Sequence, residues 1–230
     1  MAANRLVVLD NNGTMFDDLQ LAYESVRMIF QVLGLPSPSH RSYRSEISAD
    51  FMRFYRAHGV SEEVSAEDLN VIRRLYYLAH RSTARYRHDL YGFLRWCDAR
   101  PDLRVAVCSA EIDEVLIRCM SAAKILGHFT DRYADAERQG PPQLLVRGSV
   151  WPRKEEVLRE LLKQAGVSPL RAVLVGDSVE DMEDAHAAGI KAVAFANETG
   201  YHRAERLYAC KPDGIAKNFR EVRAWVEKQL

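Results

Sequence analysis

Three short stretches of the chain carry polar side chains directly after a run of apolar residues, and their residue types suit phosphate chemistry. The stretches are Asp10-Asn-Asn-Gly-Thr, Ser109-Ala and Gly176-Asp-Ser-Val-Glu-Asp. Carboxylates such as Asp10 and Asp177 can hold a hard divalent cation, and Mg²⁺ fits because it prefers oxygen ligands. A hydroxyl and a backbone N–H at a helix start can bind phosphate oxygens. Together these groups predict phosphoryl transfer, with Asp10 as a nucleophile that forms an aspartyl-phosphate.

The apolar runs before these stretches predict the elements that must hold them. Near-continuous apolar residues at 6–9, 103–108, 171–175 and 190–196 are typical of strands buried on both faces of a parallel sheet. From residue 90 onward, segments with helical spacing separate the runs. This alternation predicts an α/β fold, a parallel Rossmann-like sheet with helices on both faces. The carboxyl ends of parallel strands share one edge, so the polar groups should converge there.

Residues 17–89 follow a different pattern, because apolar residues recur there only at helical spacing. The expected helices are residues 19–33, roughly 43–58 and roughly 66–87. Asp17 and Asp18 suit the first turn of the first helix, where the helix dipole favours negative charge. We see no strand pattern in this region. We therefore expect a helical cap domain of residues 17–89, inserted into a discontinuous core domain of residues 1–16 and 90–230.

A cation for the same edge of the sheet comes from a helix that should open at Trp151-Pro152 and end before Gly166. Lys154, in its first turn, could supply a point charge that offsets the carboxylates and a developing phosphoryl charge. Arg153 is a rival for this role.

Composition excludes several classes of partner. The 230 residues include 32 Lys and Arg and 32 Asp and Glu, and this zero net charge argues against nucleic acid or a membrane surface as the main partner. The four cysteines show no CxxC spacing. The first apolar run is too short for a signal peptide, and no run approaches transmembrane length. We expect a cytoplasmic protein whose partner is a small molecule, and the sequence indicates no oligomeric state.

Taken in order, the motifs resemble those of the haloacid dehalogenase-like (HAD) hydrolase superfamily, of the phosphoglycolate-phosphatase-like type with a helical cap. The family's first motif, Asp-x-Asp-Gly-Thr after an apolar strand, reads Asp10-Asn-Asn-Gly-Thr here. The second, a strand that ends in Ser or Thr, matches Ser109. The third, a Lys at a helix start, is matched best by Lys154. The fourth, Gly-Asp-Ser-x-x-Asp, matches residues 176–181 in full.

The resemblance implies a Mg²⁺-dependent phosphatase that acts on a small phosphorylated metabolite through an aspartyl-phosphate. Asp10 would be the nucleophile and a metal ligand, and the backbone carbonyl of Asn12 and the carboxylate of Asp177 would be further ligands. Asp181 would act through water or by orienting Lys154. The residues implied to bind the phosphoryl group are Asn11, Gly13, Thr14, Ser109, Ala110 and Lys154.

One position departs from the family pattern. The family's phosphatases use the second Asp of the first motif as general acid and base, and this chain has Asn12 there. An amide transfers no proton at neutral pH, and such help is typically worth about 10²–10⁴-fold in rate. Three interpretations stay open: a natural or engineered variant with slow turnover, an enzyme for substrates with good leaving groups, or a binding protein that kept the Mg²⁺–phosphate site without catalysis.

Other branches of the superfamily fit less well. The phosphonate-cleaving branch needs a cap Lys, and residues 16–123 contain none. The dehalogenase branch usually has an aromatic residue at position 12 and needs no metal, whereas the intact fourth motif favours a metal. Phosphosugar mutases depend on the missing Asp. Within the cap, five arginines either form a solvated face or contact an anionic substrate, and they are Arg73, Arg74, Arg81, Arg85 and Arg87.

Overall fold

The computed structural model of the chain describes residues 4–48, 50–111, 113–131, 143–148 and 153–230. Its centre is a six-stranded sheet in the order β10-β9-β8-β1-β4-β7, with every pair of neighbours parallel. The strands are β1 (Arg5–Leu9), β4 (Leu103–Ser109), β7 (Val146–Gly148), β8 (Ala172–Gly176), β9 (Lys191–Phe195) and β10 (Gly214–Ala216). The predicted parallel α/β sheet is confirmed.

Strand β1 lies in the middle because its residues are apolar on both faces. Val7 and Leu9 pack into one buried cluster, and Leu6 and Val8 pack into the other. The register pairs Leu9 with Val107 of β4 and with Val175 of β8. The residues that follow these three strands therefore begin side by side at one edge of the sheet.

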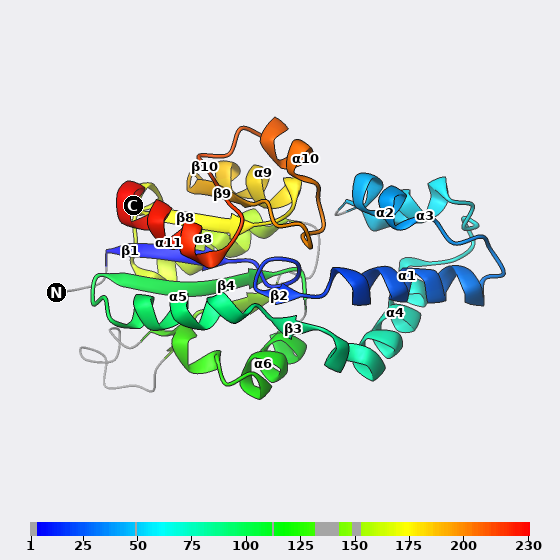
Figure 1. Cartoon of the computed structure of the whole chain (residues 1–230), viewed down its shortest axis with the longest axis horizontal. Helices are drawn as coiled ribbons and strands as arrows, with labels where there is room; N and C mark the ends of the chain where they lie inside the picture. The colour runs from blue at the N-terminus through cyan, green and yellow to red at the C-terminus, as the bar shows by residue number, and fades with distance from the viewer. Residues whose placement is uncertain (1–3, 49, 112, 132–142, 149–152) are drawn as a thin grey trace.

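Helices cover both faces of the sheet, as Figure 1 shows. The buried cluster that contains Val7 and Leu9 also includes residues of α5 (His88–Asp98), α6 (Asp113–Ala122) and α11 (Phe219–Gln229). The other cluster includes residues of α8 (Lys154–Ala165), α9 (Val179–Ala187) and α10 (Ala204–Ala209). Among the described residues, no helix combines the length and the apolar character that crossing a membrane would require. All four cysteines are free.

Four further helices form a separate layer beyond the ends of β1 and β4 (Figure 1). They are α1 (Leu19–Val32), α2 (His40–Glu46), α3 (Phe51–Ala57) and α4 (Ala66–His80). Their own apolar core includes Ile29, Phe30, Phe54 and Leu69. We propose that residues 17–89 are a cap domain on a core of residues 1–16 and 90–230, and we call this layer the cap.

Some expected cap elements were wrong in detail. The helix expected over 43–58 is two helices, because the Asp50 side chain accepts a hydrogen bond from the N–H of Arg53 and starts α3 anew. The helix expected over 66–87 ends at His80. A short antiparallel pair, β2 (Phe16–Asp17) with β3 (Arg85–Tyr86), joins the two ends of the cap where we expected no strand.

Other strands are too short to be predicted from a sequence pattern. Neither β7 nor β10 was expected, and each has only three residues. A two-residue pair, β5 (Thr130–Asp131) and β6 (Gln143–Leu144), borders the sheet. The expected helix opening at Trp151-Pro152 lies outside the described residues, and α8 is described from Lys154.

Candidate active site

The loop after β1 places a buried carboxylate at the edge of the sheet. Asp10 is only 5% exposed, and its N–H donates to the carbonyl of Val175 on β8 at 2.9 Å. Gly13 then turns the chain with φ of 77°. A Cβ at this position would lie 2.2 Å from the Asp177 carboxylate, so both the backbone angle and the space require glycine.

Three carboxylates and one ammonium group meet at this edge. Asp10, Asp177 and Asp181 are all buried, and one oxygen from each lies within 4.8 Å of the others. The Lys154 Nζ lies 2.5 Å from Asp10 Oδ1 and 2.6 Å from Asp181 Oδ1. The cluster keeps an excess of negative charge in a buried place, which is unfavourable unless a cation balances it. Its donor set, carboxylate oxygens only, fits Mg²⁺.

Burial, with a smaller contribution from neighbouring carboxylates, shifts the pKa values of Asp10 and Asp177 upward. Burial raises the pKa of Asp10 to about 8, with Lys154 working against the shift and Asp181 adding to it. Burial likewise raises the pKa of Asp177 to about 7, and Asp181 adds to the shift. Burial alone would lower the pKa of Lys154, but Asp10 and Asp181 raise it well above its ordinary range. The lysine therefore stays charged.

Helix α8 aims Lys154 rather than Arg153 into the cluster. The N–H of Lys154, in the first turn of α8, donates to Asp184 Oδ2 of α9 at 2.9 Å. The Arg153 side chain is 64% exposed, and the acids that it reaches within the described part of the chain are Glu155 and Asp184, at 3.9 and 4.0 Å. The structure thus favours Lys154 over Arg153 as the cation of the cluster. It also shows that Asp184, which the sequence did not single out, holds the start of α8.

Asp181 serves a helix and the cluster with different oxygens. Its Oδ2 accepts from the N–H and the hydroxyl of Ser178, at 3.1 and 2.7 Å, and completes a capping box at the start of α9. Its Oδ1 holds Lys154. Asp181 therefore stabilises the start of α9 and also pairs with the lysine.

The remaining predicted residues line the same edge. Thr14 Oγ1 donates to Asp177 Oδ1 at 2.9 Å, and the buried Asn11 donates from Nδ2 to Asn12 Oδ1 at 3.1 Å. Ser109 Oγ lies 3.4 Å from Asn12 Oδ1. Ala110 follows at the end of β4 and is exposed. Every predicted site residue thus lies at this edge of the sheet.

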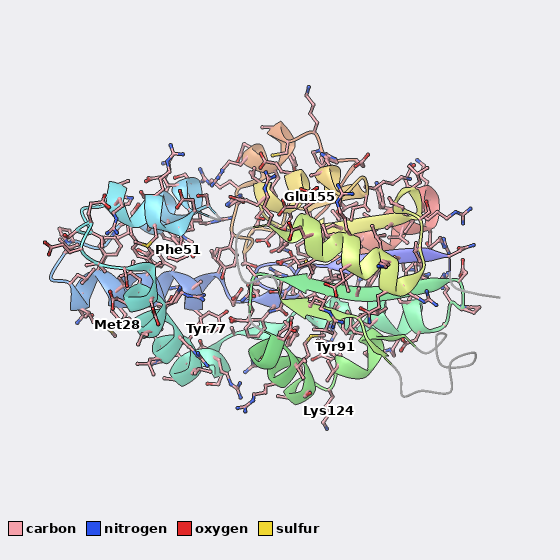
Figure 2. All side chains as sticks on the ribbon, turned by 180° about the vertical axis from the view of Figure 1, so that it is seen from behind. Met28, Phe51, Tyr77, Tyr91, Lys124 and Glu155 are labelled. Atoms are coloured by element: carbon pink, nitrogen blue, oxygen red, sulfur yellow. The ribbon has the colours of Figure 1, made fainter. Side chains whose placement is uncertain are left out.

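The side chain of Asn12 faces the cap. Its Nδ2 donates to Asp18 Oδ2 at 2.7 Å and to the hydroxyl of Tyr77 at 3.1 Å. Tyr77 belongs to α4, and Figure 2 shows it where α4 meets the rest of the molecule. Asp18 is 1% exposed, and it precedes α1 without capping it, which corrects the expectation that it lies in the first turn of that helix.

Asp18 is the centre of a polar cluster that the sequence did not reveal. Its Oδ1 accepts from the N–H of Gly13 at 2.9 Å, and its Oδ2 accepts from Asn12 and from the hydroxyls of Tyr77 and Tyr201. Burial raises the pKa of Asp18 to about 7, while the hydrogen bonds from Asn12, Gly13 and Tyr201 lower it. An acid eight residues after Asp10 was the only available signal, and nothing in the sequence says that it is buried.

Of the five cap arginines, Arg87 has a structural task. It donates from Nε to the carbonyl of Thr14 at 2.8 Å and from Nη2 to the carbonyl of Gly13 at 2.7 Å. It also forms an ion pair with Asp17 at 3.4 Å. Arg87 therefore braces the loop after β1. The other four are exposed: Arg73, Arg74, Arg81 and Arg85.

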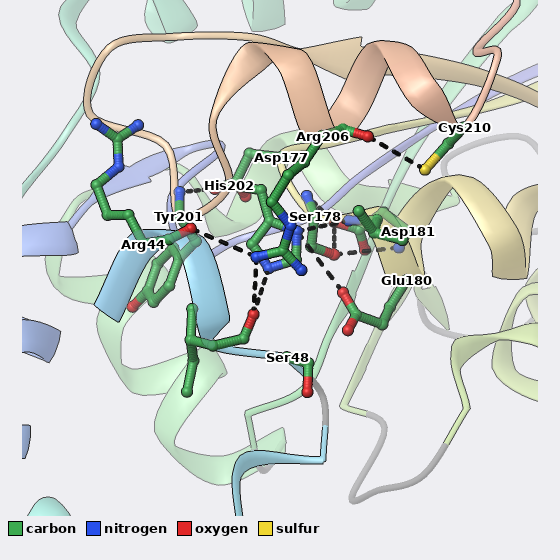
Figure 3. A network of polar contacts seen from close by, with 12 residues as sticks. Arg44, Ser48, Asp177, Ser178, Glu180, Asp181, Tyr201, His202, Arg206 and Cys210 are labelled. Carbon is green, nitrogen blue, oxygen red and sulfur yellow. Dashed lines mark hydrogen bonds and ion pairs between the residues drawn. The ribbon is translucent and has the colours of Figure 1, made fainter. Parts of the chain in front are cut away.

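A second set of contacts joins the cap to the core, as Figure 3 shows. The ring of His202 accepts from the N–H of Val179 at 2.9 Å through Nδ1, and its Nε2 lies 3.0 Å from the carbonyl of Ile47 after α2. Arg206 of α10 donates to the carbonyls of Ser45 and Ile47, at 3.0 and 3.1 Å. Tyr201, in the same segment, donates its N–H to Asp177 Oδ2 at 2.5 Å. One segment of the core thus contacts the carboxylate cluster and the cap.

Comparisons with known proteins identify a matching family and several similar proteins. The family model of haloacid dehalogenase-like hydrolases matches residues 7–195. A Mycobacterium tuberculosis protein named tyrosine-protein kinase PtkA is 29% identical over 201 residues, which are 87% of this chain and 64% of that protein. The chain thus spans less than two thirds of that relative.

Two further comparisons cover almost the whole chain. A Pseudomonas savastanoi protein named phosphoglycolate phosphatase is 23% identical over 95% of this chain and 78% of its own length. The crystal structure of a predicted phosphatase from Clostridium acetobutylicum superimposes with a TM-score of 0.78 at 16% identity, over 99% of this chain and 100% of that chain. This likeness shows the same fold.

Proposed function

The chain belongs to the haloacid dehalogenase-like hydrolases, and we propose that it is a Mg²⁺-dependent phosphatase of a small phosphorylated metabolite. The observation that carries the proposal is the meeting of Asp10, Asp177, Asp181 and Lys154 at the carboxyl edge of the sheet. Three buried carboxylates beside one lysine are an arrangement for a cation and a phosphoryl group, and not for stability.

The metal would be held by three oxygen donors. These are the carboxylates of Asp10 and Asp177 and the backbone carbonyl of Asn12, with Asp181 acting through water or through Lys154. When bound, Mg²⁺ supplies positive charge that offsets the carboxylates and the phosphoryl oxygens. Thr14 orients Asp177 through the hydrogen bond from its hydroxyl.

Asp10 would attack the phosphorus atom and form an aspartyl-phosphate, which water then hydrolyses. Lys154 and the hydroxyl of Ser109 would hold the phosphoryl oxygens, together with backbone N–H groups of residues 11–14 and of Ala110. The cap lies beyond the ends of β1 and β4 and would limit the access of water during the first step (Figure 1).

Release of inorganic phosphate tests this function. The purified chain should release phosphate from members of a panel of phosphate monoesters and acyl phosphates when Mg²⁺ is present, and EDTA should abolish the release. Asp10→Asn should be inactive, because it lacks the nucleophile, while the exposed Asp17→Asn serves as its matched control. Absence of release from the whole panel would contradict the proposal.

Asn12 supports a second candidate, a phospholigand-binding protein without turnover. An amide at this position gives no general acid or base. This candidate expects Mg²⁺-dependent binding of phosphorylated ligands, measured by calorimetry, with no phosphate released. Release of phosphate that requires Asp10 would exclude it.

The relatives named tyrosine-protein kinase lead to a third candidate, transfer of the phosphoryl group to a tyrosine hydroxyl. Their 29% identity extends over 201 residues of this chain. Incubation with ATP, Mg²⁺ and a tyrosine-containing peptide would show phosphorylated peptide if this candidate holds, and phosphate release without labelled peptide if the phosphatase proposal holds.

A further inference from the structure

Asn12 and Asp18 form a matched pair of amide and carboxylate. The amide nitrogen of Asn12 points at the buried carboxylate of Asp18 at 2.7 Å, and its oxygen points back toward Ser109 and Asn11, at 3.4 and 3.1 Å. A carboxylate at position 12 would face the carboxylate of Asp18 at hydrogen-bonding distance, and two such groups cannot both ionise without mutual repulsion. The amide at position 12 and the acid at position 18 therefore depend on each other.

Asp18 is arranged as a hydrogen-bond acceptor. Four groups donate to it: the N–H of Gly13, the amide of Asn12 and the hydroxyls of Tyr77 and Tyr201. These donors come from the loop after β1, from the cap and from the core segment around Tyr201. They occupy both carboxylate oxygens. The carboxylate is thus held beside the amide nitrogen of Asn12, on the side away from Ser109.

Resting on the phosphatase function, we propose that the Asn12–Asp18 pair restricts the substrate to one class, in which the leaving oxygen departs as a stable anion. Acyl phosphates and phosphoanhydrides belong to this class, because they release a carboxylate or a phosphate. Alkyl phosphate monoesters do not, because their alkoxide leaving group needs a proton. Asp18 is a positioning residue in this proposal: it holds the amide and does not touch the substrate.

The two chemical steps balance without an acid at position 12. A carboxylate oxygen of Asp10 forms a bond to phosphorus while the bond from phosphorus to the leaving oxygen breaks, and that oxygen keeps the electron pair and leaves as an anion. Water then attacks the phosphorus, and the bond from phosphorus to Asp10 breaks with its electron pair returning to the carboxylate. The water proton passes to the phosphate that leaves or to solvent. The aspartyl-phosphate is itself an acyl phosphate, so the second step also expels a carboxylate.

Wild-type protein can test the proposal without any mutation. Turnover with Mg²⁺ is measured for acetyl phosphate, for pyrophosphate, for a series of aryl phosphates and for glycerol phosphate. We expect kcat/KM to rise steeply as the leaving group becomes less basic. The kcat/KM for acetyl phosphate should exceed that for glycerol phosphate by at least about 10²-fold, which is the lower end of the rate gain that acid catalysis usually supplies. Equal turnover of glycerol phosphate and acetyl phosphate would overturn the proposal.

An exchange of the two side chains moves the acid to the reacting position. Asn12→Asp combined with Asp18→Asn keeps the net charge and allows the same hydrogen bond, with the amide now at position 18. The double variant should raise the glycerol phosphate to acetyl phosphate ratio of kcat/KM by about 10²-fold or more and flatten the aryl phosphate series. Asn12→Asp alone should raise this ratio less than the double variant does. It should also melt at a lower temperature, because it places two carboxylates next to each other.

Asp17→Asn is the matched control, because Asp17 is the neighbouring carboxylate and its exposed side chain pairs with Arg87 rather than facing the carboxylate cluster. It should leave the substrate ratio unchanged. A thermal melt of each variant separates loss of folding from loss of selectivity. If the double variant is folded and its substrate ratio equals that of the wild type, the proposal is wrong. If Asp18→Asn alone removes turnover of alkyl phosphates, Asp18 supplies a proton and the proposal is also wrong.

The same measurements distinguish a failure of the phosphatase proposal from a failure of the proposed substrate restriction. A protein that releases no phosphate from any substrate contradicts the phosphatase function itself. A protein that releases phosphate from alkyl and acyl phosphates equally well keeps that function and contradicts only the restriction by Asn12 and Asp18.

Discussion

At the scale of single residues, Lys154 balances the carboxylate cluster. Among the described residues, it alone bridges Asp10 and Asp181. Its ammonium group is mostly buried, with 12% of the side chain exposed. Breaking a buried ion pair from one side typically costs about 3–5 kcal/mol, because the partners keep an uncompensated charge.

We therefore expect Lys154→Met to lower the free energy of unfolding by about 3–5 kcal/mol at neutral pH without metal. Phosphate release should also fall, because no cation would hold the phosphoryl oxygens. Arg153→Met is the matched control, and its effect should stay within about 0.5 kcal/mol because the side chain is largely exposed. Urea unfolding of both variants measures the difference. Equal effects of the two substitutions would show that the lysine is not the buried partner.

The sequence was informative about residues at strand ends and uninformative about residues placed by tertiary packing. Asp10 and Asp177 follow long apolar runs, so their place at the edge of the sheet could be predicted from the pattern. Asp18 and Asp184 could not be identified as parts of the site, because an acid in a helix-rich segment looks solvated until the fold buries it. The hydroxyl of Tyr77 reaches Asn12 because the fold brings α4 beside the loop after β1.

At the scale of elements, the core segment after β9 connects the cluster with the cap. The backbone N–H of Tyr201 donates a hydrogen bond to Asp177, while Arg206 of α10 donates hydrogen bonds to carbonyls at the end of α2 (Figure 3). A guanidinium group on the last carbonyls of a helix satisfies acceptors that have no partner inside that helix, and it also suits the helix dipole. The contact therefore holds α2 against the core.

Arg206→Ala should loosen the cap while leaving the carboxylate cluster in place. We expect faster amide hydrogen exchange in α2 and a changed KM, with Mg²⁺ binding retained. Arg203→Ala is a suitable control, because that exposed residue lies in the same segment. If hydrogen exchange in α2 is the same in wild type and in Arg206→Ala, this contact does not hold the cap.

Element length explains what could be predicted about the fold. The strands of five and seven residues at the centre of the sheet have continuous apolar runs, and they were expected. Strands β2, β3, β7 and β10 have two or three residues each, and in such short segments strand periodicity cannot be told from loop sequence. They exist because longer neighbours or the cap position them.

At the scale of the whole molecule, the fold buries several carboxylates in one place, beside the ammonium group of Lys154. Burial raises the pKa of Asp10 to about 8 and that of Asp177 to about 7, above the ordinary value of 3.8. An acid whose pKa is raised by folding contributes stability that is present at low pH and lost as the pH rises through the raised value. His202 acts in the opposite sense, because burial lowers its pKa, but its effect is complete above pH 6.5.

Without metal, the melting temperature should therefore fall between about pH 6.5 and about pH 8.5. The expected size is on the order of 5 °C, because about 1 kcal/mol shifts the midpoint of a chain of this length by about 2–4 °C. Millimolar Mg²⁺ should remove the fall, since binding requires the ionised carboxylates. In Asp177→Asn, the melting temperature should fall less over this pH range, and Mg²⁺ should restore less of it. A melting temperature that rises over this pH range without metal would contradict the buried cluster.

We propose that Asp10 is phosphorylated during turnover, and trapping that phosphoryl group is the most direct test. The protein is mixed with Mg²⁺ and acetyl phosphate, quenched in acid within the first turnover, digested and examined by mass spectrometry. We predict one added phosphoryl group on the peptide that contains Asp10, absent in Asp10→Asn and absent when EDTA replaces Mg²⁺. Phosphate release without any trapped label on Asp10, or with the same rate in Asp10→Asn, would contradict the account.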